Sequence, residues 1–210
     1  WLAKSAMQDV AVRSEIVYLA SWQKGVEAID VGDPTAPRPL DAYGTLGEVY
    51  DVVVDGDRAY VTDGAESGLR VLDLDPPARG RVWPALRGTA EMRWAGGYTV
   101  QDGLAYVPVW SAGLRIVDVR DPDAPQELWS GDIGQAAQAV VAGEMAYVSA
   151  YDGLVVIDVS DPAAPEILAR FPLPGPAVGL AVREHMVYVA VENMDEAGGG
   201  TLYVIDVHEI

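Results

Sequence analysis

Aromatic and carboxylate side chains recur at fixed distances from a repeated tyrosine. A tyrosine recurs five times along the chain. Four residues after it, four of the five copies have Trp22, Trp110, Tyr151 and Glu192, and nine residues before it three copies have Asp9, Asp51 and Gln138; the remaining copies have Gly at these positions. Trp and Tyr are enriched at the energetic centres of protein interfaces, and their faces also stack on sugar rings. The spacing therefore predicts one binding surface lined by aromatic and carboxylate groups.

An irregular segment adds two further candidates to this surface. The stretch "TAEMRWAGG" interrupts the second copy and contains Arg93 and Trp94. Arg, like Trp and Tyr, is over-represented at interface hot spots. A protein partner is the favoured occupant, and a glycan is the alternative. The third reading is that the aromatic side chains only pack against one another and close a narrow channel.

Catalysis by the carboxylates is the minority interpretation. Glycoside hydrolysis needs a pair of carboxyl groups, and Asp9, Asp51 and Glu192 could act as base, orienting acid and general acid. The chain contains 32 Asp and Glu residues, so three of them in one region are expected by chance. We predict a protein that is not an enzyme, with a carbohydrate-binding or glycoside-hydrolysing propeller as the alternative.

The elements that position these residues are sequence repeats. An apolar residue followed by Asp recurs five times, and the tyrosine recurs in step with it. The Asp residues are Asp30, Asp73, Asp118, Asp158 and Asp206, and the tyrosines are Tyr18, Tyr60, Tyr106, Tyr147 and Tyr188. A period of about 42 residues is typical of a propeller blade with four strands.

Each repeat divides into four short strands. In the fourth repeat these are "QAVVAG", "MAYVSAY", "GLVVIDV" and "EILARF", and the second repeat carries a DG hairpin signal in "VDVVVDGDRAYV". Runs such as "LVVIDV" are apolar at successive positions, which indicates a sheet covered on both faces. Neighbouring blades of a propeller supply such cover.

The fold class predicted is all-β, a single five-bladed β-propeller domain over residues 1–210. Its blades span approximately 9–43, 51–87, 97–130, 138–171 and 179–210. The last blade lacks an outer strand, and we expect residues 1–5, "WLAKS", to supply it and close the ring. A piece of a larger ring is the alternative.

The most regular residues are expected to be structural. An Asp at the end of the third strand of every blade suits local hydrogen bonds to turn N–H groups. The DPxxP segments that follow begin a turn with a preset φ and serve as connectors. The repeated tyrosines are predicted to pack between blades. Function must then depend on positions at which the blades differ.

The repeats resemble the LVIVD repeat family, which is bacterial and archaeal. The resemblance rests on "GLRIVDVRDPDAP" and "GLVVIDVSDPAAP" and weakens in the second and fifth copies, where "LDLDPPARG" and "IDVHEI" lack the DPxxP turn. It implies an exported β-propeller, at the cell surface, in the periplasm or secreted. Family members often carry His before the first strand. This chain has none there, so no metal site is inherited.

Charge and composition exclude several partners. The formal net charge is −18, so nucleic acid and anionic lipid surfaces would be repelled. No apolar run is long enough for direct membrane insertion, although a membrane-associated assembly is a plausible setting for the protein partner. The chain has no Cys and two His, and no cofactor or metal site is expected. The DG-containing loops carry loose calcium-ligand spacing, for which turn formation is the better explanation.

Overall fold

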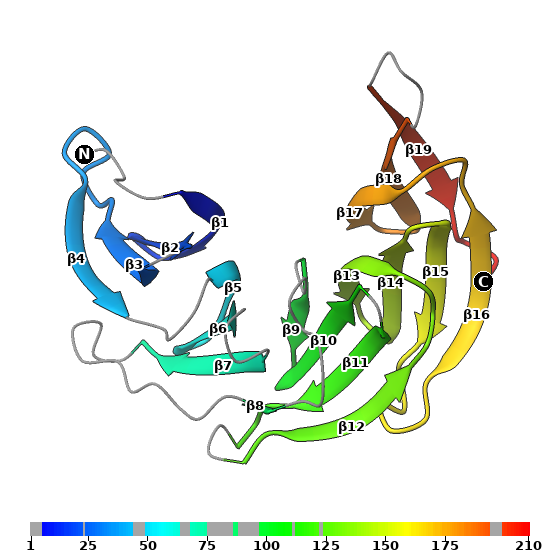
Figure 1. The fold of residues 1–210 in the computed structure, drawn as a ribbon, viewed down its shortest axis with the longest axis horizontal. Helices are drawn as coiled ribbons and strands as arrows, with labels where there is room; N and C mark the ends of the chain where they lie inside the picture. Colours follow the sequence, from blue (N-terminus) through cyan, green and yellow to red (C-terminus); the bar gives the residue numbers. More distant parts are fainter. Residues whose placement is uncertain are drawn as a thin grey trace. The chain divides into compact units, whose positions relative to one another are not determined.

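The computed structural model describes the chain outside a few loops and the amino terminus. The described residues are 6–22, 24–43, 49–63, 68–74, 86–87, 97–110, 112–121, 124–193 and 199–210. Within these ranges the chain forms strands and turns and no helix. The strands assemble into five separate antiparallel sheets, each built from consecutive strands (Figure 1).

The chain divides into two compact units. The first unit holds two sheets, with strands β1 (Met7–Arg13), β2 (Ile16–Ser21), β3 (Gly25–Asp30), β4 (Arg38–Tyr43), β5 (Val49–Asp55), β6 (Arg58–Asp63), β7 (Gly68–Asp73) and β8 (Leu86–Arg87). The second unit holds three sheets, with strands β9 (Thr99–Gln101), β10 (Leu104–Val109), β11 (Gly113–Asp118), β12 (Gln126–Gly131), β13 (Ala136–Ala142), β14 (Met145–Ala150), β15 (Gly153–Asp158), β16 (Glu166–Pro172), β17 (Ala177–Arg183), β18 (Met186–Glu192) and β19 (Gly200–Asp206).

The strand content is that of a five-bladed β-propeller, and the predicted fold class is confirmed. Four sheets have four strands in chain order, and the fifth has the three strands β17, β18 and β19. The fourth strand of the last blade was assigned to residues 1–5, which lie outside the described residues. Ring closure by this segment therefore stays a prediction.

The first two strands of every blade are joined by a tight turn with a left-handed residue. The first turn position has φ between 53° and 63° in all five blades, at Ser14, Gly56, Asp102, Gly143 and Glu184. A positive φ at this position matches the right-handed twist of the two strands. The DG signal at residues 55–56 therefore marked a real hairpin, with its turn at Gly56 and Asp57.

The repeated Asp closes the end of the third strand, as predicted. In four blades its carboxylate accepts a hydrogen bond from the backbone N–H two residues further on, with N–O distances of 2.8–3.0 Å, at Asp30, Asp118, Asp158 and Asp206. The bonds from the Arg120 side chain and backbone lower the pKa of Asp118, and the backbone bond from Ser160 lowers that of Asp158.

The DPxxP connectors are turns closed by hydrogen bonds. The N–H of Ala164 donates to the carbonyl of Asp161 at 3.0 Å, and Ala36 and Asp33 make the same bond in the first blade. The Asp161 carboxylate also accepts a bond from the N–H of Ala163. These bonds explain why Asp, and not merely any residue, precedes the proline.

The core lies between adjacent blades within each unit. The five residues from Gly153 to Ile157 on β15 are all buried. Leu154 and Val156 pack in a cluster with the fifth blade, and Val155 and Ile157 pack in a cluster with the third. The successive apolar residues of the third strand are therefore explained by burial on both faces.

The repeated tyrosines contribute to these clusters. Tyr106 packs in the cluster between the third and fourth blades, Tyr147 in that between the fourth and fifth, and Tyr18 in that between the first and second. Burial raises the pKa of Tyr106 and of Tyr147. The predicted role of the tyrosines in packing between blades is confirmed for these three.

Candidate functional site

The loop after the second strand is anchored in the same way in three blades. The backbone N–H of Trp22, Tyr151 and Glu192 each donates to the carbonyl sixteen residues earlier, on Ala6, Gln135 and Pro176, at 2.9–3.1 Å. The predicted candidates therefore occupy equivalent places at the same end of their blades. The backbone bond is the same in the three blades, while the side chain at this position differs from blade to blade.

Trp110 and Tyr151 form an exposed aromatic pair on neighbouring blades of the second unit. Their ring centroids lie 6.3 Å apart and their planes meet at 85°, an edge-to-face geometry. Trp110 remains 37% exposed and Tyr151 remains 43% exposed. The two rings touch each other without being buried, so they present apolar area to a partner.

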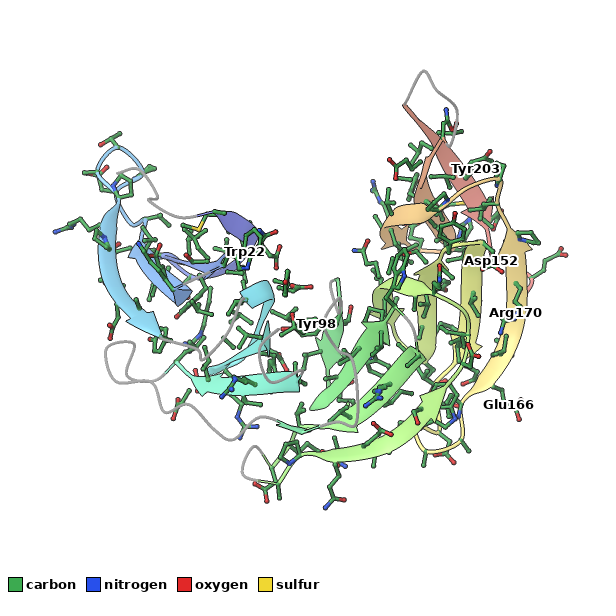
Figure 2. All side chains as sticks on the ribbon, viewed as in Figure 1. Trp22, Tyr98, Asp152, Glu166, Arg170 and Tyr203 are labelled. Carbon is green, nitrogen blue, oxygen red and sulfur yellow. The ribbon has the colours of Figure 1, made fainter. Side chains whose placement is uncertain are left out.

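A second aromatic pair forms within the first unit. Trp22 follows β2 (Figure 2), and its ring centroid lies 6.4 Å from that of Tyr50, with the planes at 42°. Trp22 is as exposed as Trp110, and Tyr50 is half-buried. Tyr50 was not among the sequence candidates, because it belongs to the first strand of the next blade and no spacing rule linked the two.

The first-strand candidates join one blade to the next. Asp9 accepts a hydrogen bond from the N–H of Val52 at 3.0 Å, and Gln138 accepts one from the N–H of Leu180 at 2.7 Å. Each acceptor directly follows the position at which its strand is bulged against the second strand. Bulges re-aim the side chains beside them, here toward the neighbouring blade.

The third blade makes this connection with its backbone. At the position equivalent to Asp9 and Gln138 the chain has Gly97, whose carbonyl accepts a bond from the N–H of Ala139 at 2.7 Å. A Cβ on Gly97 would overlap with the Gln138 side chain. The position therefore works as a connector between blades, through a side chain or through the main chain.

This connection yields the first testable prediction. Gln138→Ala leaves the buried N–H of Leu180 without an acceptor, and we expect the free energy of unfolding to fall by about 1–3 kcal/mol. Gln138→Glu keeps an acceptor oxygen, as Asp9 does in the first blade, and should retain most of that stability. Denaturant unfolding measures both.

Gln101→Ala is the matched control for this prediction. Gln101 also bridges the third and fourth blades, through a bond from its side-chain amide to the carbonyl of Gly143, but at an exposed site. Its loss should cost about 0.5 kcal/mol or less. Equal effects of the Gln101 and Gln138 substitutions would refute the connector role.

The geometry does not favour the catalytic alternative. The Asp9 carboxylate is engaged with Val52, and Asp51 is 6% exposed, so both are held within the blades. Glu192 is exposed at the end of β18. Arg93 and Trp94 lie outside the described residues. The glycoside-hydrolysing and carbohydrate-binding alternative gains no support from these placements.

A small pocket is lined by residues at the start of the third strand and the end of the fourth strand of the fourth blade. Its volume is about 90 Å³, and its lining includes Asp152 and Arg170, which Figure 2 labels on this blade. Pockets that hold small molecules measure about 300–1,000 Å³. This pocket is too small for such a ligand. The exposed aromatic pairs are therefore the stronger candidate for a binding site.

Comparison with known sequences decides the family. The LVIVD repeat matches the chain four times, over residues 5–45, 46–78, 94–132 and 133–171. The chain belongs to the LVIVD repeat family. The matches cover the first four repeats of this LVIVD repeat protein and confirm the resemblance drawn from "GLRIVDVRDPDAP" and "GLVVIDVSDPAAP". No curated protein matches the chain.

Solved structures share the fold at low sequence identity. A functionally unknown protein from Desulfotomaculum acetoxidans matches with a TM-score of 0.77 at 14% identity, over 97% of this chain and 70% of that one. The computationally designed protein Ika8 matches with a TM-score of 0.73 at 13% identity, over 98% and 59%. The chain thus spans less than two thirds of the designed protein's length.

A third likeness comes from a larger bacterial protein. The extracellular domain of a protein described as a one-component system, from B. thetaiotaomicron, matches with a TM-score of 0.70 at 14% identity, over 96% of this chain and 28% of that one. These likenesses show the fold alone. In the part of the chain that the structure describes, no helix has the length and apolar character needed to cross a membrane.

Proposed function

We propose that this LVIVD repeat protein is a non-catalytic interaction module that binds a protein partner through its exposed aromatic pairs. The observation that carries the proposal is the Trp110–Tyr151 pair, two large aromatic side chains in contact with each other and each more than a third exposed. Aromatic residues of this kind supply large, rigid contact area and dominate interface energetics.

The surroundings of the pair favour a basic segment of the partner. Asp152 follows Tyr151 directly, and its carboxylate lies near Gly134. Asp132 and Asp152 are both exposed, and the whole chain carries a net charge of −18. A Lys or Arg side chain of the partner could lie on an aromatic face and be attracted by these carboxylates.

We place this function outside the cytoplasm, as an accessory subunit or scaffold of a larger assembly. The likeness to an extracellular bacterial domain supports the compartment. The placement also agrees with the exported setting that the LVIVD resemblance implies. Fractionation of cells that express the protein tests it directly.

Substitution of the aromatic pair tests the proposed surface. Trp110→Ala combined with Tyr151→Ala removes the exposed rings, and we expect partner affinity to fall at least about 30-fold, which corresponds to a hot-spot loss of about 2 kcal/mol. The melting temperature should change little, because both rings are partly solvated in the free protein. Partners are captured from extracytoplasmic and membrane extracts, and their affinity for purified wild type and variant is then measured.

Leu168→Ala is the matched control, since Leu168 is 40% exposed on β16 in the same unit but is not part of the pair. Its affinity for the partner should equal that of the wild type. Trp22→Ala reports separately on the pair in the first unit. A partner that binds the Trp110/Tyr151 variant as tightly as the wild type refutes this surface.

A further inference from the structure

The only two histidines of the chain meet in the fifth blade. His185 lies in the turn between β17 and β18, and His208 lies two residues after the end of β19. Their ring centroids are 5.3 Å apart, with an angle of 60° between the planes. Both side chains are exposed. The two histidines lie at one end of the fifth blade, and Glu192 lies at the other end.

The repeat itself brings these two positions together. The residue after the strand-three Asp donates its N–H to the carbonyl of the second turn residue, and the fifth blade makes this bond from Val207 to His185 at 2.9 Å. The same bond, at 2.8–2.9 Å, links Val31 to Glu15, Leu74 to Asp57, Val119 to Gly103 and Val159 to Glu144. The next residue along, His208 in the fifth blade, is therefore held beside the turn.

The same two positions lie close together in other blades as well. A Cβ on Gly32, the equivalent of His208 in the first blade, would lie 3.0 Å from Oε2 of Glu15. In the third blade a Cβ on Gly103, the equivalent of His185, would overlap with the Arg120 side chain. The juxtaposition of the two positions is a property of the fold, and only the fifth blade fills both with His.

We propose that His185 and His208 form a binding site for a divalent transition-metal ion such as Zn²⁺, Ni²⁺ or Cu²⁺. Metal–nitrogen bonds of about 2.0–2.1 Å place the centroids of two imidazoles on one tetrahedral ion roughly 5 Å apart. The observed centroid distance of 5.3 Å agrees with this requirement, and both rings are exposed, so they can turn a nitrogen toward a shared ion. Neutral imidazole is a preferred ligand of these ions.

The surrounding charges favour a cation. Asp206 Oδ1 lies 4.0 Å from Nε2 of His185 and accepts a hydrogen bond from the backbone N–H of His208 at 3.0 Å. A carboxylate this close to an imidazole attracts a bound cation and, once hydrogen-bonded to the ligating ring, orients it and raises its basicity. Glu184 and Glu209 flank the two histidines in the sequence and are exposed. The site thus combines two imidazoles with the Asp206 carboxylate beside them and an acidic neighbour of each His in the sequence.

The proposed site has two protein ligands, His185 and His208, and no other residue that the structure describes fills a coordination position of the ion. Among the described residues, no group of three or more His, Cys, Asp and Glu side chains converges as metal ligands do. Water therefore completes the coordination of the bound ion. A site of this kind is reversible and exposed, in contrast to a closed structural site with four protein ligands. Short metal-binding motifs such as HExxH or paired Cys have ligands close together in sequence. They do not reveal this site, because His185 and His208 lie 23 residues apart.

Isothermal titration calorimetry of the protein without a histidine tag tests the proposal. The probe is Zn²⁺, in a buffer with excess Ca²⁺ that occupies the carboxylates of this acidic chain. We expect one Zn²⁺ per chain. His185→Gln and His208→Gln should each weaken binding at least about tenfold, because each removes one of two ligands held together. Asp206→Asn should weaken it by about tenfold, as loss of a partner of a ligating His typically does.

A transplant of the pair provides the matched control. Glu144 and Ser160 are the equivalent positions in the fourth blade. E144H combined with S160H, introduced into the chain that carries H185Q and H208Q, should restore binding of one Zn²⁺. Circular dichroism confirms that each variant is folded. Absence of Zn²⁺ binding by the wild type, or unchanged affinity in either single His variant, overturns the proposal.

Discussion

Gly153→Ala is expected to destabilise the protein by about 3 kcal/mol or more. Gly153 opens β15 with φ of 144°, a backbone conformation that residues with a Cβ rarely adopt. A Cβ at this position would also overlap with the carbonyl oxygen of Phe171 and lie 3.0 Å from the N–H nitrogen of Leu173, both on the neighbouring main chain. Backbone strain and steric overlap therefore add at one site.

Gly143→Ala separates the two effects. Gly143 has φ of 63° in the turn between β13 and β14, and a Cβ there would meet no atom within 4 Å. The substitution carries backbone strain alone, which we expect to cost about 1–2 kcal/mol. Chemical denaturation of the two variants gives the comparison. If Gly153→Ala lowers the free energy of unfolding no more than Gly143→Ala does, the main chain does not approach Gly153 as closely as the structure shows.

Ile157→Ala is expected to lower the free energy of unfolding by about 2–5 kcal/mol. The Ile157 side chain is fully buried on β15, in the cluster that also contains Tyr106 and Ile116 of the third blade. Its truncation leaves a cavity between two blades that are tied by many other contacts and can close only in part. The loss therefore includes the transfer free energy of the removed groups and a cavity contribution.

Ile167→Ala is the matched control for this substitution. Ile167 is paired directly with Ile157 across the β15–β16 ladder, and it is 44% exposed. The same chemical change at this residue should cost about 1 kcal/mol or less, because far less apolar area leaves water when Ile167 folds. Similar losses at the two residues would contradict the assignment of the core to the space between blades.

Local sequence signals predicted the blades because each signal acts within a few residues. The strand-three Asp accepts a bond from the residue two positions on, and the DPxxP turn closes over three. Each hairpin turn likewise depends on one residue with positive φ at its first position. Strand three was predicted from its successive apolar residues, and its burial on both faces follows from the neighbouring blades.

The irregular parts of the fold escaped prediction. The first strand is bulged at an equivalent place in four blades, before Asp9, Asp51, Gln138 and Gly179, and no local signal marks a bulge. A one-residue insertion shifts every later pairing in the strand, so bulges are properties of the pair of strands. The bulges decide where the first-strand side chains point.

The candidate site likewise has features that the sequence predicted and features that depend on contacts between blades. Trp22, Trp110 and Tyr151 could be predicted as equivalent loop residues, and the structure places them exposed and in aromatic pairs. Asp9 and Gln138 were predicted beside the same surface, where they instead bond to Val52 and Leu180 of the next blade. These partners lie 43 and 42 residues away, so only the packing of blades reveals them.

The sequence by itself determined the family, the number of blades, the approximate places of their strands and the turns that join them. All of these follow from a repeat in which each short segment carries its own conformational preference. The tertiary structure alone decided which polar groups are used within the fold and which remain for a partner. It also brought His185 and His208 together. Such contacts join segments that are distant in the chain, and their geometry is set by the pairing of strands and the packing of blades.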